Sequence, residues 1–263
     1  MSVPSRLDFA IDLARRAGEL LRSGFGHVGS VRYKGPSDPV TEYDVRSEAM
    51  IREAIQHAFP GDAILGEEGG PSGTGDGRWL VDPLDGTVNF SHALPIFSVT
   101  LAYLQADRPV LGVTHDPMRD EMFYASAGNG AWLNGERLHV SACEQLARSL
   151  LVTGFPYGIQ SAPNNNLGLY AAFTMQSLGV RRLGSAALDL AYVAAGRFDG
   201  YWEFGSGPWD VAAGMLMVEE AGGQVTRADG QPDPLQVPIS ILASNARLHT
   251  AMLAVLNGHQ PEV

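Results

Sequence analysis

Two carboxylates follow a short apolar run about a third of the way along the chain. Trp79-Leu80-Val81 is typical of a buried strand, and Asp82 and Asp85 come directly after it. Because Pro83 cannot donate to a strand ladder, we expect the strand to end at Asp82. The Gly-Thr pair that follows indicates a tight turn whose backbone amides can face outward. This arrangement is more specific than a polar turn, and it suits a hard divalent ion held together with a phosphate group.

A second acidic pair, Glu67-Glu68, follows another apolar run at residues 63–65. Alone, this pair is typical of a solvated acidic loop. Beside Asp82 and Asp85 it has a second interpretation, because two metal ions roughly 3.5–4 Å apart need several bridging carboxylates. Glu67 could supply one of these carboxylates.

Three further acids stand at the ends of predicted elements. Asp44, in Thr-Glu-Tyr-Asp, completes what is close to a capping box, or else it is the partner of a hydroxyl that activates water. Asp210 opens a predicted helix, where an acid favours the helix start or adds a metal ligand. Glu203 stands at a strand end, either as a solvated acid or as an acceptor for substrate hydroxyl groups. The residues alone leave each pair of alternatives open.

The composition is that of an ordinary globular protein. Of 263 residues, 45% are hydrophobic and 18% are charged, and no apolar run approaches the roughly 20 residues that span a bilayer. The charged start of the chain has no signal-peptide core, and the single Cys143 excludes an internal disulfide framework and a thiolate metal cluster. We therefore expect a cytoplasmic protein without membrane contact. The net charge of -11 disfavours general nucleic-acid binding.

Several common catalytic motifs are absent from the sequence. There is no His-x-x-x-His pair, no Gly-x-Ser-x-Gly and no Gly-x-x-x-x-Gly-Lys-Ser/Thr, which disfavours zinc hydrolases, serine hydrolases and P-loop enzymes. Residues 204–210 mimic the start of a dinucleotide-binding fingerprint. Asp210 stands where the third glycine would be, and its carboxylate would face the pyrophosphate, so we reject that interpretation.

Hydrophobic spacing and turn residues predict the elements that must position these side chains. Residues 34–39 are predicted to form a loop, residues 69–77 a flexible linker, and Asn134-Gly135 a hairpin turn. The predicted helices cover residues 7–25, 41–59, 167–178, 185–195, 209–221 and 246–256. The predicted strands cover residues 63–65, 79–81, 97–104, 110–114, 122–125, 131–133, 150–153, 180–183, 201–204, 224–226 and 239–243.

The pattern of elements changes near residue 141. Before it, consecutive strands predict an antiparallel-rich sheet; after it, strands and helices alternate. We therefore expect an N-terminal α+β lobe with the metal site over residues 1–140, and a C-terminal α/β lobe over residues 141–263 that completes the active site.

Taken in order, five segments resemble the inositol monophosphatase family of metal-dependent phosphatases. The Asp-Pro-Leu-Asp-Gly-Thr motif is the most specific part, and the resemblance covers nearly the whole chain. The resemblance implies a layered αβαβα sandwich of the α+β or α/β class that forms a homodimer. The five segments are residues 40–44, 66–68, 79–90, 184–187 and 209–214.

The resemblance also implies a role for each residue of the site. Catalysis would fall to Asp44, Thr87 and Glu67, with Asp44 and the Thr87 hydroxyl orienting the attacking water. The ligands of two or three Mg²⁺ ions would be Glu67, Asp82, Asp85, Asp210 and the Leu84 carbonyl. The substrate would contact the Gly86 and Thr87 amides through its phosphate, and Ser185, Ala186 and Glu203 through its hydroxyl groups. Supporting residues would be Glu68 and Lys34, the latter on a mobile loop near the third ion.

The function implied by the resemblance is a Mg²⁺-dependent, lithium-sensitive phosphomonoesterase. It would hydrolyse inositol monophosphate, or a related polyol or sugar phosphate, by direct attack of a metal-activated water. Val88-Asn89-Phe90, after the motif, is similar to inositol monophosphatases and to related fructose bisphosphatases. The open alternatives are a fructose-1,6-bisphosphatase or adenosine 3',5'-bisphosphate phosphatase of the same superfamily, and a regulatory binding protein that keeps the fold.

Overall fold

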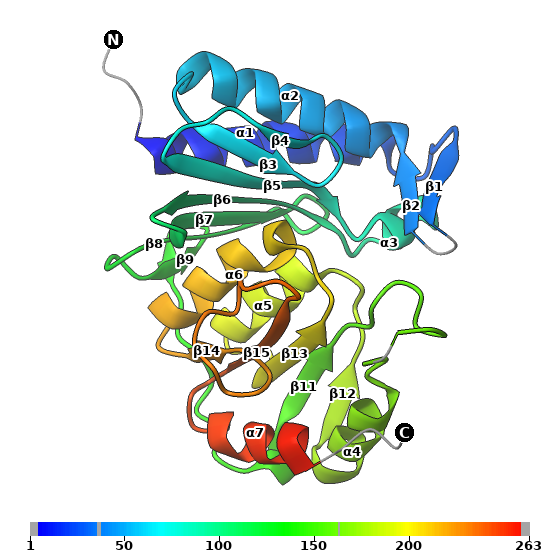
Figure 1. The fold of residues 1–263 in the computed structure, drawn as a ribbon, viewed down its shortest axis with the longest axis vertical. Coiled ribbons are helices and arrows are strands. Elements are labelled where there is room, and N and C mark those ends of the chain that lie inside the picture. The colour runs from blue at the N-terminus through cyan, green and yellow to red at the C-terminus, as the bar shows by residue number, and fades with distance from the viewer. Residues whose placement is uncertain (1–4, 36–37, 163, 259–263) are drawn as a thin grey trace.

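Five layers of helices and sheets are stacked along the long axis of the molecule (Figure 1). The computed structural model describes residues 5–35, 38–162 and 164–258. A helix pair, a large sheet, a second helix pair, a smaller sheet and a third helix pair follow one another. The layered αβαβα sandwich is therefore confirmed. Within the described ranges, no helix is both long and apolar enough to cross a membrane.

The large sheet has eight strands in the order β10-β9-β8-β7-β6-β5-β3-β4. Its β3–β5 pair is parallel, and the other pairs are antiparallel, as the sequence predicts for an antiparallel-rich sheet. Helices α1 (Arg6–Gly24) and α2 (Glu42–Ala58) pack on its outer face. Its strands are β3 (Ala63–Gly66), β4 (Gly70–Ser72), β5 (Gly77–Asp85), β6 (Ser98–Gln105), β7 (Arg108–Asp116), β8 (Glu121–Ser126), β9 (Ala131–Leu133) and β10 (Glu136–Arg137).

The smaller sheet has five strands in the order β12-β11-β13-β15-β14. Helices α4 (Leu167–Gln176) and α7 (His249–Gly258) lie on its outer side, and a short 3-10 helix covers Leu146–Arg148. Its strands are β11 (Leu150–Thr153), β12 (Gly179–Arg181), β13 (Gly200–Phe204), β14 (Gln224–Thr226) and β15 (Ser240–Ser244). The strands of the two sheets thus come from opposite sides of residue 141, while the division into two lobes stays a prediction.

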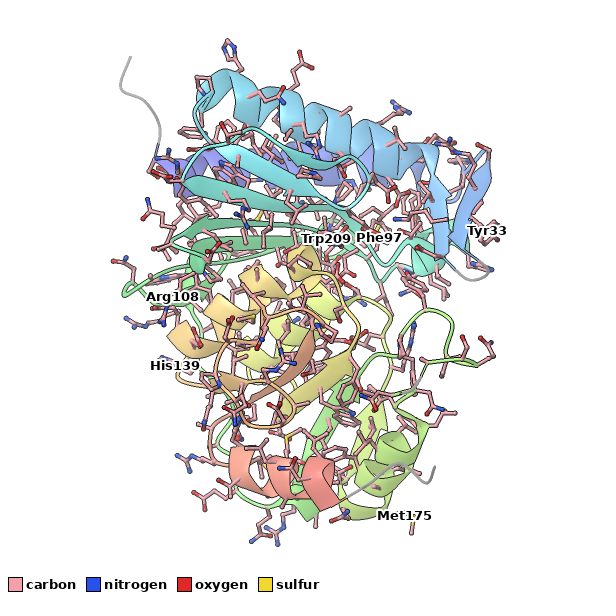
Figure 2. All side chains as sticks on the ribbon, viewed as in Figure 1. Tyr33, Phe97, Arg108, His139, Met175 and Trp209 are labelled. Atoms are coloured by element: carbon pink, nitrogen blue, oxygen red, sulfur yellow. The ribbon has the colours of Figure 1, made fainter. Side chains whose placement is uncertain are left out.

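The middle layer is the pair α5 (Ala186–Ala194) and α6 (Pro208–Glu220). Helix α6 contacts β5 to β9 on one side and β14 and β15 on the other. Both helices are buried almost all round, because they face a sheet on each side. Trp209, in the first turn of α6, lies on the side of the helix pair that faces the large sheet, as does Phe97, which directly precedes β6 (Figure 2).

The structure corrects the predicted end of the strand at Asp82. Strand β5 continues through Pro83 to Asp85, because its pairing with β6 shifts register between Asp82 and Asp85. At this irregularity the backbone N–H of Leu84 donates to the Asp82 carboxylate at 3.0 Å instead of to the neighbouring strand. A bulge of this kind aims side chains away from the regular ladder.

Two predicted irregular segments also contain strands. The predicted loop at residues 34–39 is wrong at both ends, where β1 (Val31–Gly35) pairs with β2 (Asp38–Thr41), while residues 36–37 lie outside the described residues. The predicted flexible linker at residues 69–77 is wrong at its start, because β4 pairs with β3. The predicted Asn134-Gly135 turn is confirmed: it joins β9 to β10, with both residues at positive φ.

Candidate active site

Three carboxylates from different elements meet at the seam between the large sheet and the middle layer. Glu67 follows β3, Asp82 lies in β5, and Asp210 lies in the first turn of α6. Each offers an oxygen within 4.8 Å of the others. The backbone N–H of Gly207 donates to Asp210 Oδ2 at 2.7 Å, and this bond fixes the side chain at the helix start. Within the described residues, this is the one group of three or more acidic, His or Cys side chains that could hold an ion.

Burial and mutual repulsion disfavour the charged forms of this three-carboxylate group. Burial, opposed by Lys34, raises the pKa of Glu67 from its ordinary 4.5 to about 7. Burial and the neighbouring acids raise the pKa values of Asp82 and Asp210 well above their usual range. A divalent cation would relieve this repulsion, and an all-oxygen donor set suits a hard ion such as Mg²⁺. The side chains present therefore fit the implied metal.

Lys34 is a cation that pairs with Glu67 and Glu68. Its Nζ lies 2.8 Å from Oε1 of Glu67 and 2.8 Å from Oε1 of Glu68. Burial lowers the pKa of Lys34, but attraction to the two glutamates outweighs it and raises the pKa above its ordinary value. The β1–β2 hairpin thus brings Lys34 to the two glutamates, while its supporting role near a third ion stays a prediction.

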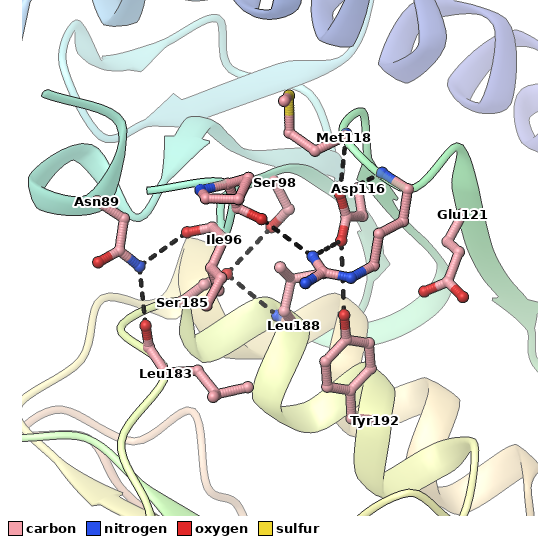
Figure 3. Close-up of polar contacts among 12 residues, drawn as sticks. Asn89, Ile96, Ser98, Asp116, Met118, Glu121, Leu183, Ser185, Leu188 and Tyr192 are labelled. Carbon is pink, nitrogen blue, oxygen red and sulfur yellow. Dashed lines mark hydrogen bonds and ion pairs between the residues drawn. The ribbon is translucent and has the colours of Figure 1, made fainter. Parts of the chain in front are cut away.

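Asp85 lies in the same pocket but outside the three-carboxylate group. Its carboxylate accepts hydrogen bonds from Ser185 Oγ at 2.5 Å and from the backbone N–H groups of Ala187 and Ala186 at 2.8 and 3.3 Å. Figure 3 shows the Ser185 hydroxyl also reaching toward Ser98. Asp85 therefore faces the first turn of α5, where the helix dipole favours an anion. Its role as a metal ligand stays a prediction.

Asp44 and Thr87 form a hydrogen-bonded pair beside the three-carboxylate group. Thr87 Oγ1 lies 2.8 Å from Asp44 Oδ1 and 3.0 Å from the Leu84 carbonyl oxygen. Asp44 Oδ2 accepts from the Thr41 N–H at 2.8 Å and completes the capping box of α2. Both interpretations of Asp44 are thus compatible, because each uses a different oxygen.

The turn at Gly86 requires glycine. Gly86 has φ of +99°, and a Cβ there would lie 3.0 Å from the Ile96 carbonyl and 3.1 Å from the Gly184 carbonyl. Helix α3 (Thr87–Ser91) begins directly after it. The Asn89 amide clamps this turn by donating to the carbonyls of Ile96 and Leu183, both at 2.8 Å (Figure 3). Gly86 and Thr87 therefore sit in a turn that is held from both sides.

The three-carboxylate group, Asp85 and the Gly86–Thr87 turn line one pocket of about 90 Å³. At one wall, Glu203 accepts a hydrogen bond from the Tyr201 hydroxyl at 2.5 Å. Burial raises the pKa of Glu203 from 4.5 to about 7. The lining residues are Glu67, Asp82, Leu84, Asp85, Gly86, Thr87, Gly154, Tyr157, Arg182, Gly184, Ser185, Ala186, Asp189, Glu203 and Asp210.

The pocket brings together most of the residues that the sequence analysis selects. Asp44, Glu68 and Lys34 are the predicted residues outside the lining. Asp44 and Lys34 form hydrogen bonds with the lining residues Thr87 and Glu67, and Glu68 accepts a hydrogen bond from Lys34. Glu203 has room because residue 154 is glycine: a Cβ there would lie 2.1 Å from Glu203 Oε2. Gly154 lies far from any predicted motif, and no local signal reveals it.

Glu48 is a supporting residue that the sequence analysis does not select. Its carboxylate accepts from the backbone N–H of Glu68 at 2.7 Å and of Gly69 at 2.8 Å, and from Arg52 Nε at 2.5 Å. The Arg52 guanidinium also donates to Ser72 Oγ in β4. In the sequence, Glu48 and Arg52 have the i,i+4 spacing of an ordinary solvated helix pair, so their burial was not predictable.

Comparisons with known proteins identify the family of this chain. Residues 4–260 match the model of the inositol monophosphatase family. The chain is 44% identical to "Nus factor SuhB" of Pseudomonas aeruginosa, over 97% of each chain, and 43% identical to "Inositol-1-monophosphatase" of Synechocystis sp., over 95% of this chain and 88% of that one. The structure of the extragenic suppressor protein suhB from Bartonella henselae superimposes with a TM-score of 0.92 at 37% identity, covering 98% of this chain and 100% of that chain. The chain therefore belongs to the inositol monophosphatase family.

Proposed function

We propose that the protein is a Mg²⁺-dependent phosphomonoesterase that hydrolyses inositol monophosphate or a related polyol or sugar phosphate. The observation that carries this proposal is the meeting of three features in one pocket. These are the three-carboxylate group, the Gly86–Thr87 turn, and the buried carboxyl group of Glu203. The three-carboxylate group suits the cations, the Gly86–Thr87 turn suits the phosphate group, and Glu203 suits the alcohol part of the substrate.

Glu67, Asp82 and Asp210 would hold Mg²⁺, with Asp85 and the Leu84 carbonyl as additional ligands for two or three ions. When bound, Mg²⁺ would neutralise phosphate charge and lower the pKa of water. The backbone N–H groups of the turn would receive the phosphate oxygens.

The Asp44–Thr87 pair would handle the proton of the attacking water. Because Thr87 Oγ1 donates its hydrogen to Asp44, a lone pair on Oγ1 is free to accept a hydrogen bond from water. Water would attack phosphorus directly, its oxygen forming the new P–O bond while the ester P–O bond breaks. The water's proton would pass through Thr87 to Asp44, and the leaving alkoxide would take up a proton from solvent. No phosphoenzyme is needed.

The alcohol part of the substrate would contact Glu203, with Ser185 and Ala186 beside it. A carboxylate in a partly enclosed pocket is a strong acceptor for hydroxyl groups, because a hydrogen bond to an ionised acceptor is stronger than one between neutral groups. The relative from Synechocystis is named an inositol-1-monophosphatase, which supports a polyol phosphate as substrate.

A phosphate-release assay with purified protein tests this proposal. The panel would contain inositol 1-phosphate, fructose 1,6-bisphosphate, adenosine 3',5'-bisphosphate and histidinol phosphate, each with Mg²⁺ and with EDTA. We expect the highest kcat/KM for inositol 1-phosphate, inhibition by Li⁺, and no release in EDTA. Preference for either bisphosphate would assign the corresponding alternative activity. Absence of Mg²⁺-dependent release from the whole panel would reject the proposal.

A regulatory binding role is the second candidate. The Pseudomonas aeruginosa relative is named a Nus factor, and it is as similar to this chain as the relative named for phosphatase activity. A test is complementation of the loss of this gene by an Asp82→Asn variant. Full complementation by a variant without phosphatase activity would favour the regulatory role. Complementation by active protein alone would favour catalysis.

We further propose that the protein is a cytoplasmic homodimer. The exposed side chains of Leu167, Met175 and Leu178 lie in and just after α4, and Met175 projects from the end of the molecule (Figure 2). A second copy covering this apolar surface would remove it from water. Sedimentation should give a dimer mass that Met175→Glu with Leu178→Glu shifts to the monomer. A monomeric wild-type protein would contradict this assembly.

A further inference from the structure

Asp189 is a buried carboxyl group in the pocket that the proposed reaction does not use. The residue is 1% exposed, and neither carboxyl oxygen has a hydrogen-bond partner among the described residues. It lines the same pocket as Glu203. A buried polar group without a partner is rare in proteins, because it loses its hydration and gains nothing in return.

Helix capping does not explain this carboxyl group. The free N–H groups at the start of α5 already have other acceptors: Ala186 and Ala187 donate to Asp85, and Leu188 donates to Ser185 Oγ. The N–H of Asp189 itself donates to the Ser185 carbonyl at 3.0 Å. The helix dipole alone is a weak compensation for burying an acid at this depth.

The charged groups around Asp189 do not compensate for its burial either. Burial, with Glu203 and Asp85 nearby, raises its pKa well above the usual range, and Arg182 opposes this shift only in part. Within the described part of the chain, Arg182 makes no hydrogen bond to the Asp189 carboxyl group, because neither oxygen of that group has a partner. The missing hydrogen-bond partner must therefore come from a molecule that enters the pocket.

We propose that Asp189 is a specificity-determining residue that hydrogen-bonds to a hydroxyl group of the substrate's alcohol part. With Glu203 it forms a two-carboxyl acceptor, so that the pocket selects phosphate esters with hydroxyl groups on neighbouring carbons. This inference rests on the proposed phosphatase function. A site built around a substrate hydroxyl discriminates strongly against analogues without it, because its own buried polar groups then stay unpaired.

The experiment compares two substrates across variants, each assayed as kcat/KM with Mg²⁺. Inositol 1-phosphate carries neighbouring hydroxyl groups, whereas p-nitrophenyl phosphate carries none. We expect Asp189→Ala to lower the inositol-to-aryl ratio of kcat/KM by about ten-fold or more, chiefly through KM for inositol 1-phosphate. Asp189→Asn keeps the shape and one acceptor oxygen, so it should recover part of the lost ratio.

Asp116→Asn is the matched control. Asp116 is also a buried acid, but its carboxylate is paired with the N–H groups of Met118 and Arg119 and with the Arg119 guanidinium, outside the pocket (Figure 3). This variant should lower the melting temperature and leave the ratio unchanged. In parallel, the double variant Asp189→Ala/Glu203→Ala should lose less than the product of the single losses, because the two carboxyl groups act as one unit.

Two outcomes overturn the inference and differ from each other. Suppose that wild-type protein hydrolyses inositol 1-phosphate, and that Asp189→Ala lowers kcat/KM equally for both substrates or leaves both values unchanged. Asp189 is then structural, and the proposed function stands. If wild-type protein hydrolyses no phosphate ester, the proposed function fails and this inference fails with it. A melting curve for each variant separates loss of fold from loss of discrimination.

Discussion

A carboxylate at a helix start can serve the helix and the site at once. Asp44 accepts from Thr41 with one oxygen and from Thr87 with the other. Asp85 likewise faces the N–H groups of α5 while lining the pocket. Burial raises the pKa of both acids, and these hydrogen bonds counteract the shift. The fold therefore holds the carboxyl groups of Asp44 and Asp85 in fixed orientations.

Removing the Thr87 hydroxyl tests the proposed path of the proton. Thr87→Val keeps the side-chain shape but removes the group that contacts Asp44, and we expect kcat to fall about 10²-fold or more with little change in KM. Thr87→Ser keeps the hydroxyl and should retain most activity. Steady-state kinetics with inositol 1-phosphate measure both. Equal kcat for the Val variant and wild type would contradict this role.

Glu203 gives the metal-free protein a defined pH dependence. Its pKa is raised from 4.5 to about 7 by burial, so the folded state binds the proton more tightly than the unfolded state. Its contribution to stability is present below pH 4.5 and is lost as the pH rises toward 7, by about 3 kcal/mol. Glu203→Gln removes this loss.

Chemical unfolding in EDTA at pH 5 and pH 8 provides the measurement. We expect the Gln variant to gain stability relative to wild-type protein on going from pH 5 to pH 8. An unchanged difference between the two proteins across this range would show that Glu203 ionises normally.

Site residues that lie within one short motif are predictable from the sequence. Site residues whose position depends on packing between distant segments are not. Asp82, Asp85, Gly86 and Thr87 lie close in sequence, and the structure places all four in one pocket. Asp189 is the one acid of the apolar helix α5, but its burial follows from the packing of α5 against strands of both sheets. The partners of such a residue come from segments that local sequence patterns do not connect.

At the scale of elements, α2 positions two parts of the site from one helix. Its N-terminus supplies Asp44, Ser47 donates to the Pro83 carbonyl at 3.0 Å, and Glu48 holds the backbone after Glu67. The helix thus spans both acidic segments. Its bounds are close to those predicted, because its apolar spacing and capping box are local signals.

Loss of Glu48 should disturb the site without touching the pocket. Glu48→Ala leaves the N–H groups of Glu68 and Gly69 without their charged acceptor, and we expect a loss of about 2–4 kcal/mol in unfolding free energy. Mg²⁺ affinity should fall as well, because the backbone that follows Glu67 is no longer held by hydrogen bonds to Glu48. Glu53→Ala, on an exposed position of the same helix, is the control. Calorimetry of unfolding and of Mg²⁺ binding would measure both effects, and equal values for the two variants would reject this role.

Strand boundaries were less predictable than the helix. The continuation of β5 through Pro83 depends on the register shift against β6, which is a tertiary feature. Strand β4 forms in a Gly-rich segment because Arg52 binds the Gly70 carbonyl and Ser72, and β3 offers an edge. Local propensity cannot reveal such partners.

For the whole molecule, the site depends on how the layers pack. The large sheet supplies Asp82 and, just after β3, Glu67; the middle layer supplies Asp210, and the smaller sheet supplies Glu203. Figure 1 shows these layers stacked on one another. The layered architecture was predictable through the family resemblance. The strand order was not, because periodicity places residues on faces but does not choose their neighbouring strands.

Joining the layers through acidic ligands should make the fold sensitive to Mg²⁺. An ion that binds the folded state alone stabilises it by about 2.7 kcal/mol at a concentration one hundred times its Kd. We expect the melting temperature of wild-type protein to rise with Mg²⁺ concentration, and that of Asp82→Asn to rise far less. Differential scanning calorimetry measures both, and an equal rise in the two proteins would place the ion elsewhere.

The most direct test of the central claim is phosphate release from inositol 1-phosphate as a function of Mg²⁺ concentration, with wild-type protein and Asp210→Asn side by side. The proposed site predicts saturable activation of the wild-type protein by Mg²⁺ and no activity in EDTA. It also predicts a loss of at least about 10²-fold in kcat/KM for Asp210→Asn, with the fold retained. Metal-independent hydrolysis by the wild-type protein, or full activity of Asp210→Asn, would contradict a catalytic site built on Glu67, Asp82 and Asp210.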